Sequence, residues 1–279
     1  MKKTAAFFLI FAMCLSLCCC GAKPEPVISP APQEEEQNAE PDDAASEQVA
    51  EESAPEAQDE TEDDAPSEIV ETVKEKAPTL LYMGHASLRI VTADEKVIYI
   101  DPYAGNDYDL PADLILVTHE HFDHNDINRV KSRSEDSQII TWKEALDGGK
   151  HQSFDLPYVS VEAVEAGNNR FHDLSKCVGY VLRFPNGVSV YVSGDTSTTA
   201  QMATMAEMQI DYAFFCCDGV YNMDPAEAAK CAELVGAKHN SPYHTASTDS
   251  GMIFDYDHAD QFDAPNRLIL SPGDEIELR

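Results

Sequence analysis

Basic residues are scarce in this chain of 279 residues. There are 19 lysines and arginines against 51 aspartates and glutamates, so the formal net charge at pH 7 is −32. No basic cluster offsets this charge, and a surface this acidic repels nucleic acid and anionic lipid. A nucleic-acid partner or a polyanionic macromolecular substrate is therefore disfavoured, although a local metal site could still bind a small anion.

Cysteine metal motifs and serine-nucleophile motifs are also absent. None of the cysteines shows C-x-x-C spacing, and no serine stands in a G-x-S-x-G segment. Four cysteines lie in the later part of the chain: Cys177, Cys216, Cys217 and Cys231. Two of them are adjacent in the apolar run "YAFFCCDG", which is typical of a buried strand. We therefore expect buried free thiols rather than a disulfide framework.

The first twenty residues are expected to be a lipoprotein signal peptide, outside the fold. A short positive start, "MKK", precedes an apolar run of secretory length that is too short to span a membrane. Leu17 stands three residues before Cys20, and Gly21 follows, as in a bacterial lipoprotein box. This pattern predicts export and a lipid anchor in the bacterial membrane at Cys20, with Cys18 or Cys19 as alternatives. An ordinary cleaved signal peptide is the other interpretation.

Residues 21–78 are expected to form a disordered acidic linker. They contain no aromatic residue, and residues 23–77 hold 19 acidic side chains against 3 lysines. Such a composition buries too little apolar surface to offset the entropy of ordering. A spacer that holds a domain away from the membrane fits this composition better than a binding tail for a cationic partner.

Residues 79–279 carry alternating strand and helix signals and are expected to form one α/β (α+β) domain. Runs rich in branched and aromatic residues predict strands at 79–84, 86–92, 96–101, 112–118, 137–141, 158–164, 178–184, 188–194 and 210–217, with two more in 267–279. Asn186-Gly187 marks a hairpin turn. Helices are expected within 125–133, 142–149, 198–208 and 224–236, the last with an aspartate cap, an early proline and a final glycine. This order favours two sheets packed together and flanked by helices.

The segment "LILVTHEHFDHND", residues 114–126, concentrates metal-ligand side chains after an apolar strand. His119 and His121 have the spacing that places both side chains on one side of an extended chain, so both can reach one cation. Asp123 and His124 follow after a turn and stay near. A polar turn would explain one or two such residues but hardly four. This mixed nitrogen and oxygen set favours Zn²⁺, with Mn²⁺ or Fe²⁺ as alternatives.

Later strand ends offer further ligands. Asp195 follows the strand in "YVSGDTS", where it could bridge two metals or merely cap a helix. His244 in "SPYHT" and His172 in "NNRFHDLS" would each usually be structural or exposed if considered alone. Three loops that bring ligand types to one sheet edge favour a shared site.

The pattern T-H-x-H-x-D-H, then G-D-T, then P-x-H resembles the metallo-β-lactamase superfamily. The segments "MGHASLRI", "VIYIDPY", "NNRFHDLSKCVGYVL", "VYVSGDT" and "SPYHT" resemble its small-molecule hydrolase branch, which includes ascorbate-6-phosphate-lactonase-like proteins. The resemblance covers residues 79–279 and implies a four-layer αββα sandwich with a dinuclear site at one edge. It implies His119, His121 and His172 at the first metal, Asp123, His124 and His244 at the second, and Asp195 as the bridge.

Two positions near this pattern need comment. Asn168 stands where some members have the third histidine, and we assign that role to His172 in the later "FH". His85 in "GHAS" is expected to support the ligands from outside, with a plain structural histidine as the alternative. His151, His239 and His258 are expected to be surface or structural residues.

The resemblance implies a hydrolase that uses hydroxide held between two divalent metals, with Asp123 and Asp195 as catalytic residues and no covalent enzyme intermediate. A small-molecule ester, lactone or phosphodiester-type bond is the expected target. A dinuclear-iron oxidoreductase is one alternative, disfavoured because those proteins usually have glutamate in place of His121. A metal-binding lipoprotein without turnover is the other.

Overall fold

The computed structural model describes residues 76–279. The expected signal peptide, the lipidation site at Cys20 and nearly all of the expected linker lie outside the described residues. Within residues 76–279, no helix has the length and apolar character needed to cross a bilayer.

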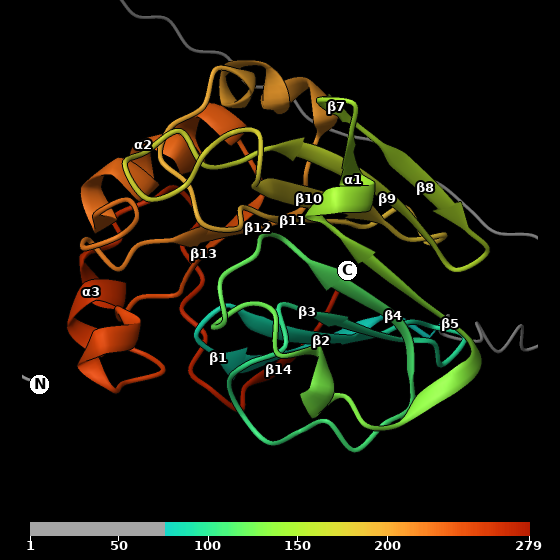
Figure 1. Cartoon of the computed structure of the whole chain (residues 1–279). Helices are drawn as coiled ribbons and strands as arrows, with labels where there is room; N and C mark the ends of the chain where they lie inside the picture. Colours follow the sequence, from blue (N-terminus) through green and yellow to red (C-terminus); the bar gives the residue numbers. More distant parts are fainter. Residues whose placement is uncertain (1–75) are drawn as a thin grey trace, which may run out of the picture. The chain divides into compact units, whose positions relative to one another are not determined.

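Two six-stranded sheets pack face to face (Figure 1). In spatial order, the first sheet contains β14 (Glu275–Glu277), β1 (Thr79–Gly84), β2 (Ser87–Val91), β3 (Val97–Ile100), β4 (Ala112–Val117) and β5 (Arg133–Thr141). The second contains β13 (His239–Tyr243), β12 (Tyr212–Cys216), β11 (Ser189–Val192), β10 (Val178–Arg183), β9 (Val159–Glu165) and β8 (Ser153–Leu156). A separate two-stranded ribbon joins β6 (Leu146–Asp147) to β7 (Lys150–His151).

Both sheets mix parallel and antiparallel pairs, and this arrangement positions the site. In the first sheet β3, β4 and β5 are parallel, and in the second β11, β12 and β13 are parallel. Parallel strands end at the same edge of their sheet, so the segments that follow them emerge together. At this edge the two sheets are joined directly, because the backbone N–H of Val178 donates to the carbonyl oxygen of Thr118 at 3.0 Å.

The core lies between the sheets and along their central strands. Every residue of β3, β4, β11 and β12 is buried, which explains why these segments are continuous apolar runs rather than alternating ones. The Tyr180 hydroxyl crosses the core from β10 and donates to the Val117 carbonyl at 3.0 Å. The four cysteines of the domain are buried free thiols, as expected.

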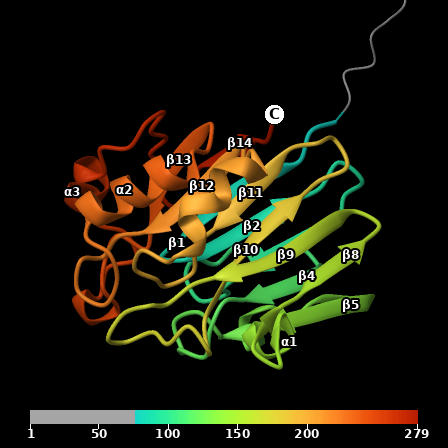
Figure 2. The same ribbon diagram turned by 90° about the horizontal axis from the view of Figure 1, so that it is seen from above.

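Helices cover the outer face of the second sheet. The 3-10 helix η2 (Gln201–Met208) and α2 (Pro225–Val235) lie over it, with α2 above β12 and β13 (Figure 2), while α3 (Tyr256–Gln261) follows the short turn η3 (Thr248–Ser250). The expected start and end of α2 are confirmed: the Asp224 side chain accepts from the Glu227 N–H at 2.8 Å, and Gly236 closes the helix with φ +66°. The α/β sandwich predicted from the sequence is thus confirmed.

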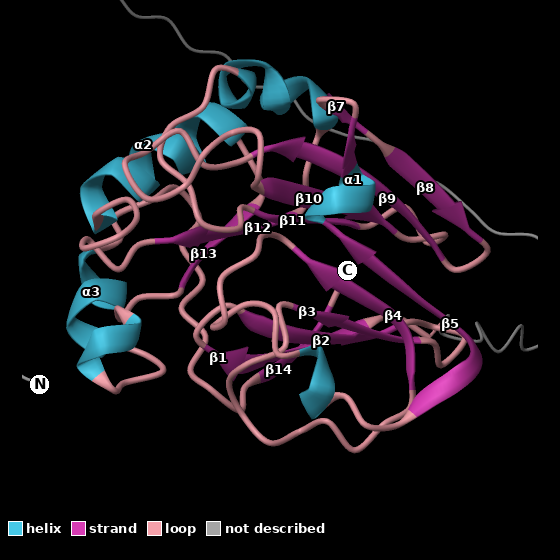
Figure 3. Ribbon diagram, viewed as in Figure 1, coloured by secondary structure: helices cyan, strands magenta, loops and turns pink. Residues whose placement is uncertain are grey.

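The prediction of a helix within residues 125–133 was wrong. Only η1 (Ile127–Arg129) forms there, because the Asp126 side chain makes no cap hydrogen bond and Arg133 already belongs to β5, paired with Ala112. Figure 3 shows loops and this short turn below the first sheet. The helix expected in 142–149 is reduced to α1 (Trp142–Ala145) and gives way to β6. Of the two closing strands expected, only β14 forms, while Arg267 makes a single bridge to Asn240.

Candidate metal centre

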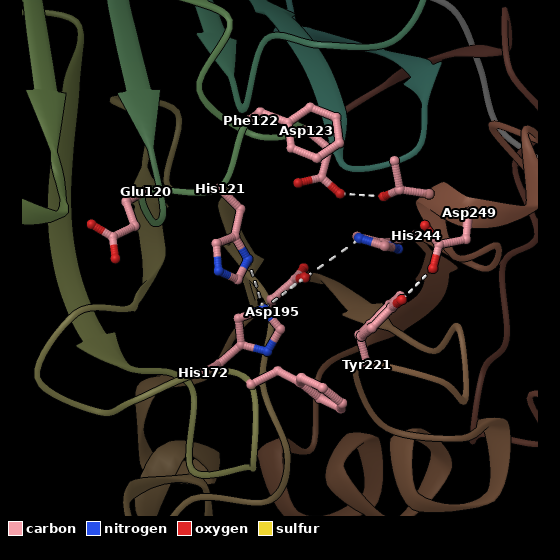
Figure 4. Close-up of a pocket in the computed structure, with 11 residues that line it drawn as sticks. Glu120, His121, Phe122, Asp123, His172, Asp195, Tyr221, His244 and Asp249 are labelled. Atoms are coloured by element: carbon pink, nitrogen blue, oxygen red, sulfur yellow. Dashed lines mark hydrogen bonds and ion pairs between the residues drawn. The ribbon is translucent and has the colours of Figure 1, made fainter. Parts of the chain in front are cut away.

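The predicted ligands come from both sheets and meet at the edge where the parallel strands end. His119 follows β4, Asp195 follows β11, and His244 comes directly after β13. His172 comes from the loop between β9 and β10. Figure 4 shows His121, His172, Asp195 and His244 pointing toward one another.

The first ligand group consists of His119, His121 and His172. Each offers a ring nitrogen, and these atoms lie within 4.8 Å of one another. His172 Nε2 lies 3.2 Å from His121 Nδ1. His119 and His172 are buried, whereas His121 is exposed.

The second ligand group consists of His85, Asp123, His124 and His244. Their ligand atoms also lie within 4.8 Å of one another, and all four residues are buried or nearly so. His85 Nε2 lies 3.3 Å from Asp123 Oδ2, and the His85 ring centroid lies 3.7 Å from that of His244. Sequence reasoning placed His85 outside the ligands, but in the structure it stands among them.

Asp195 lies between the two groups. Its Oδ2 is 3.3 Å from His172 Nε2 and 4.0 Å from His119 Nε2. Its Oδ1 is 3.2 Å from His124 Nε2, and its Oδ2 is 3.4 Å from His244 Nε2. One carboxylate therefore contacts both groups, as a bridging ligand must.

The structure thus brings together all seven residues predicted from the sequence and separates the alternatives. Asn168 is exposed, and its side-chain amide donates to the Thr198 carbonyl at 2.6 Å. It therefore points away from the position that His172 occupies. His151, His239 and His258 belong to β7, β13 and α3 and join neither ligand group.

Several buried ligand atoms approach one another closely but form no hydrogen bond of adequate geometry among residues 76–279. These atoms are Nε2 of His119, Nε2 of His124, Nε2 of His244 and Oδ1 of Asp195. A buried polar atom without a partner is costly, by about 1–3 kcal/mol each. Convergent nitrogen lone pairs and a carboxylate oxygen form a set that suits Zn²⁺ or a similar divalent ion, so the residues fit the metals that the motif implies.

In His119, His124 and His172 the opposite ring nitrogen is held by a partner that sequence reasoning missed. Asp101, at the end of β3, lies 2.8 Å from His124 Nδ1 through Oδ2 and accepts from the Thr118 N–H at 2.8 Å. The Thr118 hydroxyl lies 3.1 Å from His119 Nδ1, and Asn169 Oδ1 lies 3.2 Å from His172 Nδ1. Such contacts fix the ring orientation and direct Nε2 toward the centre. The available signal was that Asp101 directly follows an apolar strand and that Asp195 lies shortly after another.

The Asp195 carboxylate is also held by residues that belong to neither ligand group. The Asn222 side-chain amide donates to Asp195 Oδ2 and to Asp218 Oδ2, both at 2.8 Å. Asp218, after β12, accepts the backbone N–H groups of Val220 and Tyr221 through Oδ1. The loop after β12 therefore holds Asp195 in place.

Burial and charge set the protonation of the ligands. Burial and the neighbouring His124 lower the pKa of His119, and burial also lowers the pKa of His172. Burial alone would raise the pKa of Asp195, but the adjacent His124 and His244 hold it well below its usual range. Burial alone would lower the pKa of His124 and of His244, but the adjacent Asp195 raises both, so these two imidazoles would release a proton when metal binds.

The backbone at the site adopts conformations that are uncommon for side chains other than glycine. His85, Asp101 and His244 have φ values of +50°, +45° and +45°. Left-handed conformations of such residues cost of order 1–3 kcal/mol and persist where the surroundings enforce them. Their gathering at one cluster points to a site built for function.

Comparison with known proteins agrees with this geometry. The Beta-lactamase superfamily domain matches residues 79–244, from β1 to the last predicted ligand. The chain belongs to this superfamily. The metallo-β-lactamase resemblance expected from the motifs is therefore confirmed.

Relatives of this superfamily member have been given related names. A UPF0173 metal-dependent hydrolase of Thermococcus kodakarensis is 30% identical over 224 residues, which cover 71% of this chain and 98% of the relative. A structure from Parabacteroides distasonis, whose name assigns it as a metal-dependent hydrolase, has 27% identity and a TM-score of 0.56 over 69% of this chain and 91% of its own. A metallo hydrolase from Ignicoccus hospitalis, with 20% identity and a TM-score of 0.57, covers 73% of this chain and 99% of its own and shares the fold.

In this superfamily member, a pocket of about 580 Å³ opens above the ligands. His121, Asp123, His172, Asp195 and His244 line it. Its other lining residues are Glu120, Phe122, Phe171, Tyr221, Thr248 and Asp249. A small molecule in this pocket would contact both ligand groups.

Proposed function

We propose that the chain is a metal-dependent hydrolase that cleaves an ester, lactone or phosphodiester-type bond in a small molecule. The observation that carries this proposal is the convergence of unpartnered ligand atoms of His119, His124, Asp195 and His244 beneath a pocket. The names of the relatives support the same reaction class.

The centre would supply the reactive water. Two divalent ions, Zn²⁺ by preference and Mn²⁺ or Fe²⁺ otherwise, would lower the pKa of water toward about 7 and polarise the oxygen of the scissile group. Asp195 holds the two ligand groups at a fixed separation and contributes negative charge between them. Asp123 accepts a hydrogen bond from the Thr248 hydroxyl and faces His85, so its orientation is fixed.

The pocket lining offers no free serine, threonine or cysteine nucleophile. None of these is serine or cysteine, and the Thr248 hydroxyl is already hydrogen-bonded to Asp123. Burial raises the pKa of the Cys216 thiol and of the Cys177 thiol, the latter to about 12, so neither is an activated nucleophile. We therefore propose direct hydrolysis without a covalent enzyme intermediate.

Turnover by the full chain tests this function. Metal-loaded protein is assayed on ester, lactone, β-lactam and phosphodiester panels, then again after chelation and after return of Zn²⁺ or Mn²⁺. We expect activity that chelation abolishes and metal restores, with His119→Ala inactive and the matched His239→Ala unchanged. Metal binding without turnover would favour a ligand-binding protein, and bound iron with visible absorbance would favour an oxidoreductase. A trapped acyl- or phosphoryl-enzyme in mass spectrometry would refute direct hydrolysis.

We also propose that the enzyme is exported and anchored by lipid at Cys20. The support is Leu17 three residues before this cysteine and Gly21 directly after it. Mass spectrometry of the native N-terminus should find a lipid-modified cysteine, and an unlipidated mature terminus would contradict the anchor. Cys20→Ala alone is a weaker test, because Cys18 or Cys19 could replace it.

A further inference from the structure

Two aromatic rings at the pocket are unusually exposed. Phe122 and Phe171 both line the pocket, and 70% and 42% of their surfaces remain accessible to solvent. Large apolar side chains exposed beside a candidate site mark a surface that a ligand covers. They come from different loops, Phe122 from the segment after β4 and Phe171 from the loop between β9 and β10.

Each exposed ring is supported by a second aromatic ring. Tyr103 packs edge to face against Phe122, with centroids 6.0 Å apart and an interplanar angle of 84°. Tyr221 packs in the same way against Phe171, at 4.9 Å and 80°. Such pairs hold the rings in place before any ligand arrives, and their apolar faces suit a flat apolar group.

Apart from the candidate metal ligands, the charged side chains that line the pocket are both acidic. No lysine or arginine lines it, whereas Glu120 and Asp249 do, on opposite sides in Figure 4. Glu120 is compensated by Lys176, whose Nζ lies 3.2 Å away. Asp249 accepts a hydrogen bond from the Tyr221 hydroxyl and forms no ion pair among residues 76–279. The Arg170 guanidinium lies over the Phe171 ring at 5.2 Å and is not part of the lining.

We propose that the substrate of the hydrolase inferred above is a small aromatic compound without negative charge. Its ring contacts Phe122 and Phe171, and its neutral or cationic end faces Asp249. Bound metal at the floor would attract the scissile group. At the rim, where Asp249 has no cationic partner among residues 76–279, an anionic substituent away from the metals is repelled. This inference rests on the proposed function for the reaction but not for the ligand preference of the pocket.

Three probes of similar size separate ring recognition from charge. Binding of benzyltrimethylammonium, benzyl alcohol and benzenesulfonate to the metal-loaded full chain is measured by ligand-observed NMR. We expect the cation and the alcohol to bind, and the sulfonate to bind roughly tenfold more weakly or not at all, because it meets an uncompensated carboxylate. Because bound metal would itself attract the sulfonate, the same comparison is repeated after chelation. Equal or tighter binding of the sulfonate to the chelated protein would overturn the proposal, and loss of that binding in Arg170→Ala would name the residue responsible.

Matched variants locate the two contributions. Phe122→Ala should weaken all bound probes severalfold, whereas Tyr256→Ala, which removes a ring that is 62% exposed and lies outside the pocket, should not. Asp249→Asn should weaken only the cation, and Asp147→Asn should change nothing. Unchanged binding in both Phe122→Ala and Phe171→Ala would refute the aromatic contact.

Turnover and probe binding can fail separately. No hydrolysis on the panels with intact probe selectivity would overturn the proposed function and leave the ligand preference standing. Hydrolysis by a protein that shows no preference against the sulfonate would support the proposed function and overturn the proposed ligand preference.

Discussion

The two ligand groups of the metal centre differ in how the protein surrounds them. The first includes the exposed His121 and depends on His172, which is held by Asn169 of the same loop. The second is buried, with Asp101 at the end of β3 behind His124, His244 directly after β13, and left-handed backbone at His85 and His244. One group is therefore part of the sandwich itself, and the other is completed by a surface loop. We expect the second group to bind its metal more tightly.

Removal of Asp195 should have the largest effect on activity, because this ligand contacts both groups. Asp195→Ala should lower kcat by roughly 10³-fold or more, which corresponds to about 4 kcal/mol of lost transition-state stabilisation. Steady-state kinetics, metal analysis and circular dichroism together separate this loss from unfolding. Full activity in a folded Asp195→Ala protein would refute the bridging role.

Each ligand group has a residue that holds one of its histidine rings: Asp101 for His124 and Asn169 for His172. Substituting these two residues should distinguish a ring held from a strand end from a ring held by a loop. Asp101→Ala should weaken metal binding at the second group by about 10–100-fold and reduce folding stability by roughly 3 kcal/mol, since it breaks a buried hydrogen-bonded network. Asn169→Ala should weaken the first group similarly but reduce stability by only about 1 kcal/mol. Competitive metal titration and denaturant unfolding measure both effects. Equal losses of stability would remove the distinction.

Graded chelation should release the metals in order. Because His121 is exposed, the first group should lose its metal at lower chelator concentration than the buried second group. Metal content after dialysis against increasing chelator would show two steps, and His119→Ala should remove only the earlier one. A single step that releases both metals would contradict the comparison.

The third ligand of the first group can be checked with two neighbouring residues. His172→Ala should lower occupancy to about one metal, whereas Asn168→Ala should leave both, because the Asn168 amide already donates to the Thr198 carbonyl. Elemental analysis of the two purified variants is sufficient. The opposite pattern would transfer the role to Asn168.

The smallest effect, on the melting temperature, is expected when the acidic segment that precedes the domain is deleted. Residues 23–77 lack the apolar content to join a core, so protein that starts near Ala77 should melt within about 2 °C of protein that starts at Gly21. Scanning calorimetry measures both. A large loss of stability would show that this acidic segment contacts the domain.

Local patterns in the sequence were sufficient for the strands and the principal ligands. Continuous apolar runs predicted β3, β4, β11 and β12, because burial on both faces leaves a local signature. His119 and His121 were recognisable because their spacing and position after a strand are also local. The bounds of α2 followed from Asp224, Pro225 and Gly236.

Contacts between distant segments could not be predicted in the same way. Asp101 supports His124 across the sheet, and Asn222 reaches Asp195 from another loop, so no local spacing links either pair. The Asn125-Asp126 pair had the composition of a helix start, but pairing of Arg133 with Ala112 in the sheet prevailed. Tertiary pairing overrode local propensity there.

The ligands are distributed along the chain from His85 to His244 and come from both sheets. Contacts between segments so far apart in sequence form slowly, because closing the long loops between them costs conformational entropy. The centre therefore cannot assemble before the sheets dock, and metal capture would accompany the last step of folding. Because metal binds the native state and stabilises it by mass action, a shortage of metal would shorten the lifetime of the folded domain against proteases. Metal supply would thus control how much of this protein survives as well as how fast it works.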